Sequence, residues 1–446
     1  MLTAIKFHTF RSYQEARLPL SPLTVLIGAN ASGKSNAIEG MRLLAWLAQG
    51  QKLSAIQHAI SQSNRVLRGR VEDLGYGQSE FFGLGCESNE RDWNTLNVVL
   101  RRRADGLHIA NEALYGLSES VPLYELKLPS RGQRSDVLVA YNNFKKGGRK
   151  PQILCSDQFA IFTQLMSPAS LFAQHKEAKE TIPKKTSAYA RWLSEMLFLD
   201  PQPVQMRDYS FPGEKRLQGD GGNLSGVLCD LWGDDSQAKS ERYRSQRATI
   251  LSFIQSLPEQ NIADLSFLKE PRGGVMVQLH ETFGDKPRKV DASLLSDGTL
   301  RVLAIAAAML SADESSLVVI EEIDNGVHPS RARHLLTQIR DIAERRKLRV
   351  LLSTHNPALL DALPDSAIPD VVFCYRDPQN GASRLLRLSD FVDYPELIAQ
   401  GSLGQLATSG LLERVVKAGG SEQDRQARAQ AWLARKRAGA GSGGST

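Results

Sequence analysis

Cysteine and long apolar runs are both scarce in this sequence. The 446 residues include four cysteines, Cys86, Cys155, Cys229 and Cys374, and no CxxC pair or Cys/His spacing joins them. The apolar run from 302 to 310 falls short of the roughly 18 to 20 residues that cross a bilayer. The first residues, MLTAIKFHTFRS, lack the pattern of a secretory signal. We therefore expect a cytoplasmic protein without a disulfide framework, a zinc site or a membrane partner.

A strong excess of one charge is missing too. Lys and Arg total 55 and Asp and Glu total 49, which gives a formal net charge of +6. This excess would suit phosphate contacts with nucleic acid, but it is small for a chain of this length. The basic segments 101–103, 145–150 and 345–347 could face DNA or simply be solvated. DNA therefore stays open as a partner.

Residues 28–35, GANASGKS, match a phosphate-binding loop. They follow the strand-like run LTVLI and precede the helix-patterned run NAIEGMRLLAWLAQG, as such a loop requires. Small residues let the backbone N–H groups point at phosphate oxygens, next to the positive end of a helix. We expect Lys34 to neutralise the β- and γ-phosphates of ATP and Ser35 to bind Mg²⁺. The residues predicted to bind ATP here are Gly28, Asn30, Ser32, Gly33, Lys34, Ser35 and Asn36.

Two apolar strands end in polar residues that suit ATP hydrolysis. The run LVVI leads into Glu321 and Glu322, and a buried strand delivers carboxylates at its end only where they have a task, because unpaired buried charge is costly. We predict that Glu321 holds Mg²⁺ through water and that Glu322 polarises the attacking water. The run RVLLS leads to His355, which is predicted to sense the γ-phosphate or the attacking water. Alone, a strand-end histidine is more often structural.

The order of these motifs resembles that of the ABC-type ATPases, in particular the SMC, RecF and OLD-related branch. Within that branch the sequence looks most like ATPases often found beside phage-defence effectors, and the resemblance runs from Met1 to about Gly410. It identifies LSDGTLR, residues 295–301, as a form of the ABC signature. In this motif Ser296, Asp297 and Gly298 would bind the γ-phosphate of ATP held by a second copy of the chain.

Other segments carry the same resemblance less specifically. Residues 321–329, EEIDNGVHP, resemble the motif EEPENGLHP, and residues 219–224 and 404–410 resemble two shorter motifs of these ATPases. Gln158 is the candidate for the glutamine that couples Mg²⁺ to the interface between lobes, although Gln164 or no functional glutamine at all remain alternatives. Arg11 matches a position that contacts nucleotide or this interface in the branch, with a plain surface arginine as the alternative.

The resemblance and the element pattern together predict an α/β fold with a two-lobed ABC-ATPase core. Residues 79–143 have the pattern of an antiparallel sheet, and strands alternate with helices after residue 267, which indicates a parallel sheet. No sustained heptad pattern predicts a long coiled coil. We expect a first lobe at 1–150, a helix-rich insertion at 151–267, a second lobe at 268–415, and a helix with a flexible tail at 416–446.

The resemblance implies ATP and Mg²⁺ as cofactors and a dimer, or a higher oligomer, that closes around ATP. The leading hypothesis is an ATPase that controls a separately encoded effector protein, most simply in antiviral defence. The alternative is a RecF-like ATPase that binds DNA in repair or recombination. Intrinsic nuclease activity of the OLD type is not expected, because the residues after His355 contain no compact Glu and Asp-x-Asp cluster.

Overall fold

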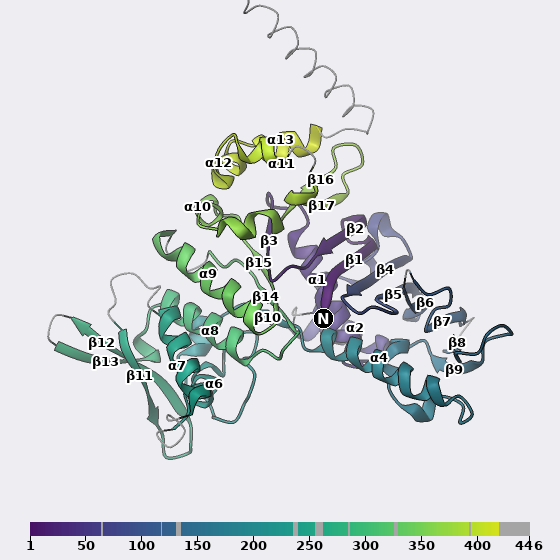
Figure 1. Ribbon diagram of the computed structural model, residues 1–446, viewed down its shortest axis with the longest axis horizontal. Helices are drawn as coiled ribbons and strands as arrows, with labels where there is room; N and C mark the ends of the chain where they lie inside the picture. Colours follow the sequence, from purple (N-terminus) through teal and green to yellow (C-terminus); the bar gives the residue numbers. More distant parts are fainter. Residues whose placement is uncertain are drawn as a thin grey trace, which may run out of the picture.

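The computed structural model of the chain describes most of its length. The described residues are 1–63, 66–116, 118–130, 135–234, 240–254, 262–283, 286–324, 329–391 and 394–418. Two predicted features lie outside them: residues 325–328 of the acidic motif, and the tail beyond residue 418. The strands of the described residues form three sheets, of eight, six and three strands (Figure 1).

The six-stranded sheet is the centre of the fold and is mostly parallel. Its strand order is β10-β14-β15-β3-β16-β17, and only the pair of β16 and β17 is antiparallel. The bounds are β3 (Leu23–Ile27), β10 (Leu197–Leu199), β14 (Leu317–Ile320), β15 (Arg349–Ser353), β16 (Val371–Arg376) and β17 (Ser383–Arg387). Every residue of β3 and β14 is buried, as expected for strands covered on both faces.

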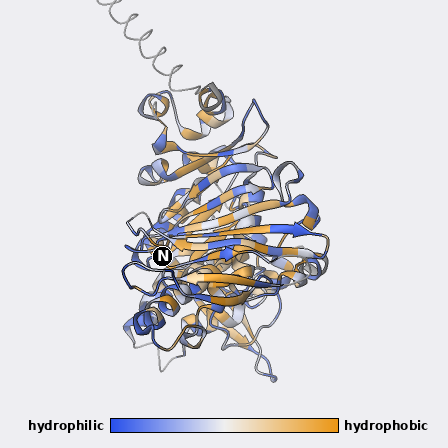
Figure 2. Ribbon diagram, turned by 90° about the vertical axis from the view of Figure 1, so that its right-hand side faces the viewer, coloured by the Kyte–Doolittle hydropathy of each residue, from blue (hydrophilic) through white to orange (hydrophobic). Residues whose placement is uncertain are grey.

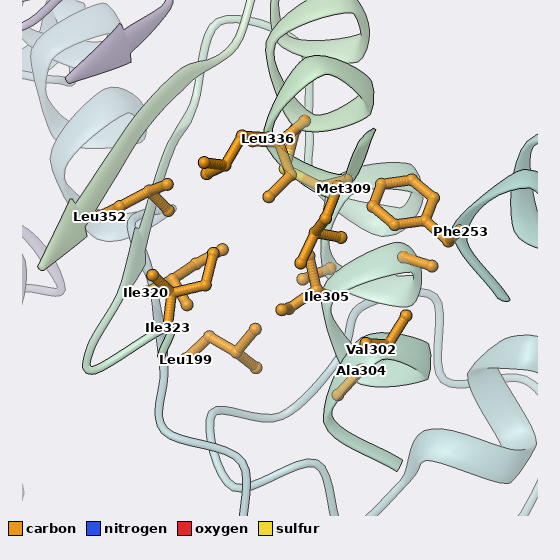
Figure 3. Close-up of a cluster of buried hydrophobic side chains, with 14 of the residues drawn as sticks. Leu199, Phe253, Val302, Ala304, Ile305, Met309, Ile320, Ile323, Leu336 and Leu352 are labelled. Carbon is orange, nitrogen blue, oxygen red and sulfur yellow. The ribbon is translucent and has the colours of Figure 1, made fainter. Parts of the chain in front are cut away.

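Successive residues of these strands divide between two hydrophobic cores. Val25 and Ile27 of β3 face the core that contains helices α8 and α9, and Leu26 faces the core that contains α1 and α4. The helix bounds are α1 (Lys34–Ala48), α4 (Lys176–Ser194), α8 (Asp297–Ser311) and α9 (Pro329–Arg345). Figure 3 shows the first core, where Ile305 and Met309 of α8 lie among side chains of β14, α9 and α7 (Glu241–Ile254).

The eight-stranded sheet is antiparallel and packs against α1 and α4, as the sequence predicts for residues 79–143. Its order is β2-β1-β4-β5-β6-β7-β8-β9. The bounds are β1 (Leu2–Phe10), β2 (Tyr13–Pro19), β4 (Phe81–Ser88), β5 (Thr95–Arg103), β6 (Gly106–Tyr115), β7 (Tyr124–Leu128), β8 (Asp136–Tyr141) and β9 (Gln152–Ser156). Its apolar side chains belong to the same core as α1, so the phosphate-loop helix is held between two sheets.

The segment expected to be one helix-rich insertion, 151–267, contributes to several parts of the molecule. β9 extends the eight-stranded sheet, α4 packs on α1, and β10 pairs with β14. Helices α6 (Leu224–Trp232) and α7 pack on α8, beside a three-stranded sheet of β11 (Ile262–Lys269), β12 (Val275–Phe283) and β13 (Lys286–Asp291). The four domain boundaries stay a prediction, and this segment is not a separate unit in the structure.

Three short helices lie earlier in the chain: α2 (Ile56–Ser63), α3 (Ile161–Gln164) and α5 (Pro203–Met206). The other short helices lie at the carboxyl end of the described chain. They are α10 (Pro357–Asp361), α11 (Tyr394–Ile398), α12 (Leu403–Thr408) and α13 (Leu411–Ala418). Gly404 donates its backbone N–H to Asp361 Oδ1 at 2.6 Å, and an added Cβ there would overlap the carbonyl oxygen of Pro357. The motif at 404–410 therefore packs α12 on α10.

Apolar residues run along the strands in the interior, and the loops at the margin are mostly hydrophilic (Figure 2). Among the helices that the structure describes, none has both the length and the apolar character that a bilayer span requires.

Candidate nucleotide site

A cavity of about 400 Å³ lies at the carboxyl ends of β3, β14, β15 and β16. Neighbouring parallel strands present their carboxyl ends at one edge of a sheet, which is where ligands bind in folds of this kind. The lining consists of Asn30, Ala31, Ser32, Gly33, Lys34, Ser35, Asn36, Ile38, Arg68, Glu321, Glu322, Ser353, Thr354, His355 and Arg376. The structure thus brings together the phosphate loop, the two carboxylates and the histidine.

The phosphate loop needs glycine where it approaches the rest of the fold. Gly28 has φ +145° and Gly33 has φ +124°, and side chains are disfavoured at both values. An added Cβ on Gly28 would overlap the carbonyl oxygen of Cys374 on β16, and one on Gly33 would overlap Ser383 Oγ on β17. The loop therefore packs in direct contact with the hairpin of β16 and β17.

A polar network supports the loop from behind. The Tyr13 hydroxyl donates to the carbonyl of Gly33 at 3.0 Å, and Asn36 Nδ2 donates to Ser12 Oγ at 2.7 Å. The Ser383 hydroxyl contacts Ser12 Oγ at 2.7 Å and the carbonyl of Ser32 at 2.5 Å. Asn36, predicted to bind ATP, thus uses its side-chain amide within the protein.

The start of α1 fits an anion. No side chain of the described residues caps this helix, and its first turn holds no acidic residue, so its N–H groups and its positive dipole end are available to a ligand in the cavity. Ser32 Oγ is buried and has no hydrogen-bond partner among the described residues. Lys34 Nζ donates to the carbonyls of Gly28 (2.6 Å) and Ala29 (3.0 Å). Burial lowers the pKa of Lys34, and the charges of Cys374 and Glu322 oppose that shift.

The two carboxylates have different surroundings. Glu321 Oε1 lies 2.6 Å from a guanidinium nitrogen of Arg42 on α1, and the guanidinium of Arg42 covers the ring of Phe198 at 4.6 Å. Glu322 is exposed, adopts φ +48° and donates its backbone N–H to Ser353 Oγ at 3.1 Å. Such a conformation is costly for a residue other than glycine, and it places the Glu322 side chain in the cavity lining.

His355 reaches the cavity from the end of β15. Its Nδ1 lies 3.5 Å from Asp324 Oδ2, and its side chain is 57% exposed whereas that of Asp324 is 7% exposed. Asp324 Oδ1 is buried without a hydrogen-bond partner among the described residues. A buried carboxylate beside an exposed imidazole favours one ring orientation and leaves the other ring nitrogen available.

The signature residues lie elsewhere in the chain's own structure. Ser296 is the N-cap of α8, where its hydroxyl accepts the N–H of Thr299 at 3.2 Å, and Asp297 pairs with Arg207 at 2.6 Å. Ser296 and Asp297 are exposed, and neither they nor Gly298 belong to the described lining of the cavity.

The structure does not bring the predicted glutamine to the site. Gln158 follows β9, the last strand of the eight-stranded sheet, and its amide nitrogen donates to the carbonyl of Leu107 at 3.2 Å and contacts His108 Nδ1 at 3.1 Å. Gln164 likewise bonds to the backbone of Ser156. Both amides are used locally and neither lines the described cavity. The metal role of Gln158 stays a prediction.

Arg11 is neither a surface residue nor part of the described lining. Its side chain is 11% exposed and pairs with Glu39 of α1 at 3.0 Å, and it also donates to the carbonyl of Arg68. Arg68 in turn lines the cavity and pairs with Glu39 at 2.5 Å. Arg11 therefore helps to position the segment that carries Arg68.

Three arginines at or beside the cavity were not singled out from the sequence: Arg42, Arg68 and Arg376. Arg376 is the charged last residue of the mostly apolar strand VVFCYR, and Glu321 directly follows the apolar strand LVVI. This shared pattern is the sequence feature that could have marked Arg376 as a site residue. The segment 219–224 also approaches the site, because Asp220 lines an adjoining cavity of about 420 Å³ together with Ser35 and Glu321. Asn223 in that segment is buried and donates to the carbonyl of Arg216 at 2.9 Å.

Comparisons with known proteins agree with this geometry. The family described as "AAA domain, putative AbiEii toxin, Type IV TA system" matches residues 23–110 and 168–361. The chain is 33% identical over 112 residues to the DNA replication and repair protein RecF of Picosynechococcus sp., which is 25% of this chain and 29% of that protein. It is 32% identical over 102 residues to an ATP/GTP phosphatase of Helicobacter pylori, which is 22% of this chain and 27% of that protein. The chain thus spans less than a third of these curated relatives.

Two solved structures of similar extent are SMC heads. One is the SMC head bound to the C-winged helix domain of ScpA, with a TM-score of 0.46, 15% identity, and coverage of 86% of this chain and 96% of that one. The other is the SMC head domain from Thermotoga maritima, with a TM-score of 0.39, 12% identity, and coverage of 86% and 98%. Because the family match spans more than half of the residues, the chain belongs to this AAA-domain family, and about a quarter of it is similar in sequence to RecF.

Proposed function

We propose that the chain binds ATP with Mg²⁺ in the cavity at the carboxyl end of the parallel sheet and hydrolyses it together with a second copy of the chain. One observation carries this proposal: the phosphate loop, Glu321, Glu322 and His355 come from three neighbouring parallel strands and line one cavity of about 400 Å³. The uncapped start of α1 and the orphaned Ser32 hydroxyl fit phosphate oxygens.

Each side chain then has a defined task. Lys34 opposes the charge of the β- and γ-phosphates, and Ser35 and Glu321 are the oxygen donors that would hold Mg²⁺, a cation that prefers such ligands. Bound Mg²⁺ would offset charge on the phosphates. Glu322 orients and polarises the attacking water, and His355 contacts that water or the γ-phosphate. Arg42 pairs with Glu321, so the metal site and this ion pair would compete for one carboxylate.

The second copy supplies the signature. Ser296, Asp297 and Gly298 stand at the exposed start of α8, a 15-residue helix, where they are accessible to ATP held by another molecule. In this arrangement two chains face each other, and the ATP held by one chain contacts the signature of its partner. ATP binding then favours the dimer and hydrolysis releases it, because nucleotide shifts an equilibrium only through a difference in affinity between the two states.

The output of this cycle is proposed to be control of a separately encoded effector protein in antiviral defence. The family description, which names a putative AbiEii toxin and a type IV toxin–antitoxin system, supports this reading. The second candidate is DNA binding in repair or recombination, and it is favoured by the RecF relatives, although these match only about a quarter of the chain.

Glu322→Gln tests both ATP hydrolysis and the function that it controls, because it keeps the shape of the side chain but removes the charge that polarises water. With ATP, the variant should bind nucleotide, hydrolyse it far more slowly than the parent chain and accumulate as a dimer in sedimentation measurements. A parental hydrolysis rate would show that Glu322 is not the base.

The same variant separates the two outputs. The parent chain and Glu322→Gln are each co-purified with the product of the neighbouring gene, in the presence of ATP, of ADP or of no nucleotide. In a second experiment each is titrated with duplex DNA at several salt concentrations. Retention of the neighbouring protein that depends on nucleotide supports effector control. If the neighbouring protein never associates, while DNA binds in an ATP-dependent and salt-dependent way, DNA binding in repair replaces effector control as the proposed output.

A further inference from the structure

We propose that Arg376 binds the triphosphate of the nucleotide as a second cation beside the phosphate loop, in addition to Lys34. The inference rests on the proposed ATP site and adds to it a residue that lies outside the sequence motifs. Arg376 is the last residue of β16, the strand that pairs directly with β3, and it lines the cavity together with the loop that follows β3.

The backbone holds the guanidinium of Arg376 in place. Its Nε donates to the carbonyl of Ala31 at 3.0 Å, and one terminal nitrogen donates to the carbonyl of Gly381 at 2.7 Å. Ala31 is in the phosphate loop itself, with φ +61°. The guanidinium therefore lies beside the part of the loop that would surround the phosphates, and donors remain on it for a ligand.

The turn that provides the second contact is itself well ordered by hydrogen bonds. The N–H of Gly381 donates to the carbonyl of Asp377 at 2.8 Å, and Asn380 Oδ1 accepts the N–H of Ala382 at 2.9 Å. The Tyr76 hydroxyl also donates to the carbonyl of Asn380 at 3.0 Å, which ties the turn to the first lobe. A side chain held at both ends of its guanidinium loses little freedom on binding a ligand.

The charge of Arg376 is not matched by a carboxylate. Within the described residues no Asp or Glu lies at ion-pair distance from it, whereas Arg68 pairs with Glu39 and Arg384 on the same hairpin pairs with Asp377. Carbonyl groups orient a guanidinium but carry no net charge. A fixed and uncompensated cation in the lining of a phosphate cavity favours an anionic ligand.

The chemistry favours the phosphates over the adenine ring. A guanidinium donates two parallel hydrogen bonds to phosphate oxygens with a geometry that lysine cannot reproduce. Nε and one terminal nitrogen of Arg376 already donate to backbone carbonyls, and the N–H groups that remain on the terminal nitrogens can donate to phosphate oxygens. Arg376 and Lys34 would then both hold the triphosphate.

Four variants test this role by titration with ATP and with inorganic tripolyphosphate, both in Mg²⁺. Arg376→Ala and Arg376→Gln should each weaken both ligands by about 10- to 100-fold, the usual effect of losing a charge-assisted hydrogen bond. Gln keeps a donor for the Ala31 carbonyl, so it separates charge from backbone support. Arg376→Lys should recover part of the affinity. Arg384→Ala, on the same hairpin but paired with Asp377, should bind like the parent chain.

The outcomes distinguish this inference from the proposed function. If the parent chain binds ATP, Lys34→Ala does not, and Arg376→Gln binds both ligands like the parent, Arg376 has no role in binding phosphate. A loss for ATP without a loss for tripolyphosphate assigns Arg376 to the base or ribose and overturns the proposal. If the parent chain binds neither ligand, the proposed ATP site itself fails.

Discussion

Glu112 on β6 is a fully buried carboxyl group, and its protonation should make stability depend on pH. Its Oε1 accepts hydrogen bonds from the Tyr124 hydroxyl and the N–H of Phe162, and its Oε2 accepts the N–H of Ile161, each at 2.7 Å. These contacts tie β6 and β7 to the start of α3 (Ile161–Gln164). Burial nevertheless raises the pKa of Glu112 from 4.5 to about 7, because desolvation outweighs the three hydrogen bonds that favour the charged form.

The sign and the size of the effect follow from this shift. A carboxyl group whose pKa is higher in the folded state than in the unfolded state contributes stability that is complete below pH 4.5 and is lost as the pH rises through about 7. Each pKa unit corresponds to about 1.4 kcal/mol, and part of the loss occurs below pH 5. The free energy of unfolding should therefore fall by roughly 2 to 3 kcal/mol between pH 5 and pH 8 because of this group.

Urea unfolding of the parent chain and Glu112→Gln at pH 5, 6, 7 and 8 measures the effect. The Gln side chain has one acceptor oxygen fewer than the carboxylate, which lowers the free energy of unfolding by the same amount at every pH. This constant loss cancels when the change with pH is compared between the two proteins. The parent should lose roughly 2 to 3 kcal/mol relative to the variant from pH 5 to pH 8. A difference that stays constant within about 0.5 kcal/mol would show that Glu112 does not titrate in this range and would refute the reasoning.

Three further experiments probe the site. Lys34→Ala should abolish ATP binding, and Ser296→Arg should block hydrolysis. A mixture of the two proteins should regain partial ATPase activity, because each mixed dimer keeps one intact composite site. No recovery in proven heterodimers would contradict sites shared between two chains. Gly28→Ala should lower the free energy of unfolding by about 2 to 4 kcal/mol, since an added Cβ meets backbone, whereas Gly106→Ala, also at positive φ but in open space, should cost only about 1 kcal/mol in urea unfolding. Arg42→Met keeps contact with Phe198 but releases Glu321, so half-maximal ATPase activity should need about 3- to 10-fold less Mg²⁺; an unchanged requirement would show that the ion pair does not compete with the metal.

The contiguous parts of the site are predictable from the sequence. The phosphate loop, the acidic strand end and His355 are each a run of neighbouring residues after an apolar strand, and parallel pairing then brings those strand ends to one edge. In the structure these residues line one cavity. The chemical roles of these residues stay predictions.

The parts that depend on distant packing are not predictable in this way. Gln158 resembles a functional glutamine only by its place in the chain order, and the sheet order puts its strand at the edge away from β1. Arg376 enters the cavity because β16 pairs with β3, a register that no local motif encodes. The same holds for the segment 151–267. The sequence predicts one helix-rich insertion there, but in the structure its helices pack into two different hydrophobic cores.

The position of β3 in the central sheet also determines when the site can form during synthesis. β3 comes early in the chain, but its neighbours β15 and β16 begin at Arg349 and Val371. Until the ribosome has released both, the mostly apolar strand LTVLI has two open edges and the phosphate loop lacks the hairpin that supports it. A nascent chain that ends before β15 should therefore hold a phosphate loop that cannot retain nucleotide, and it depends on chaperones or on fast completion to keep that strand from aggregating.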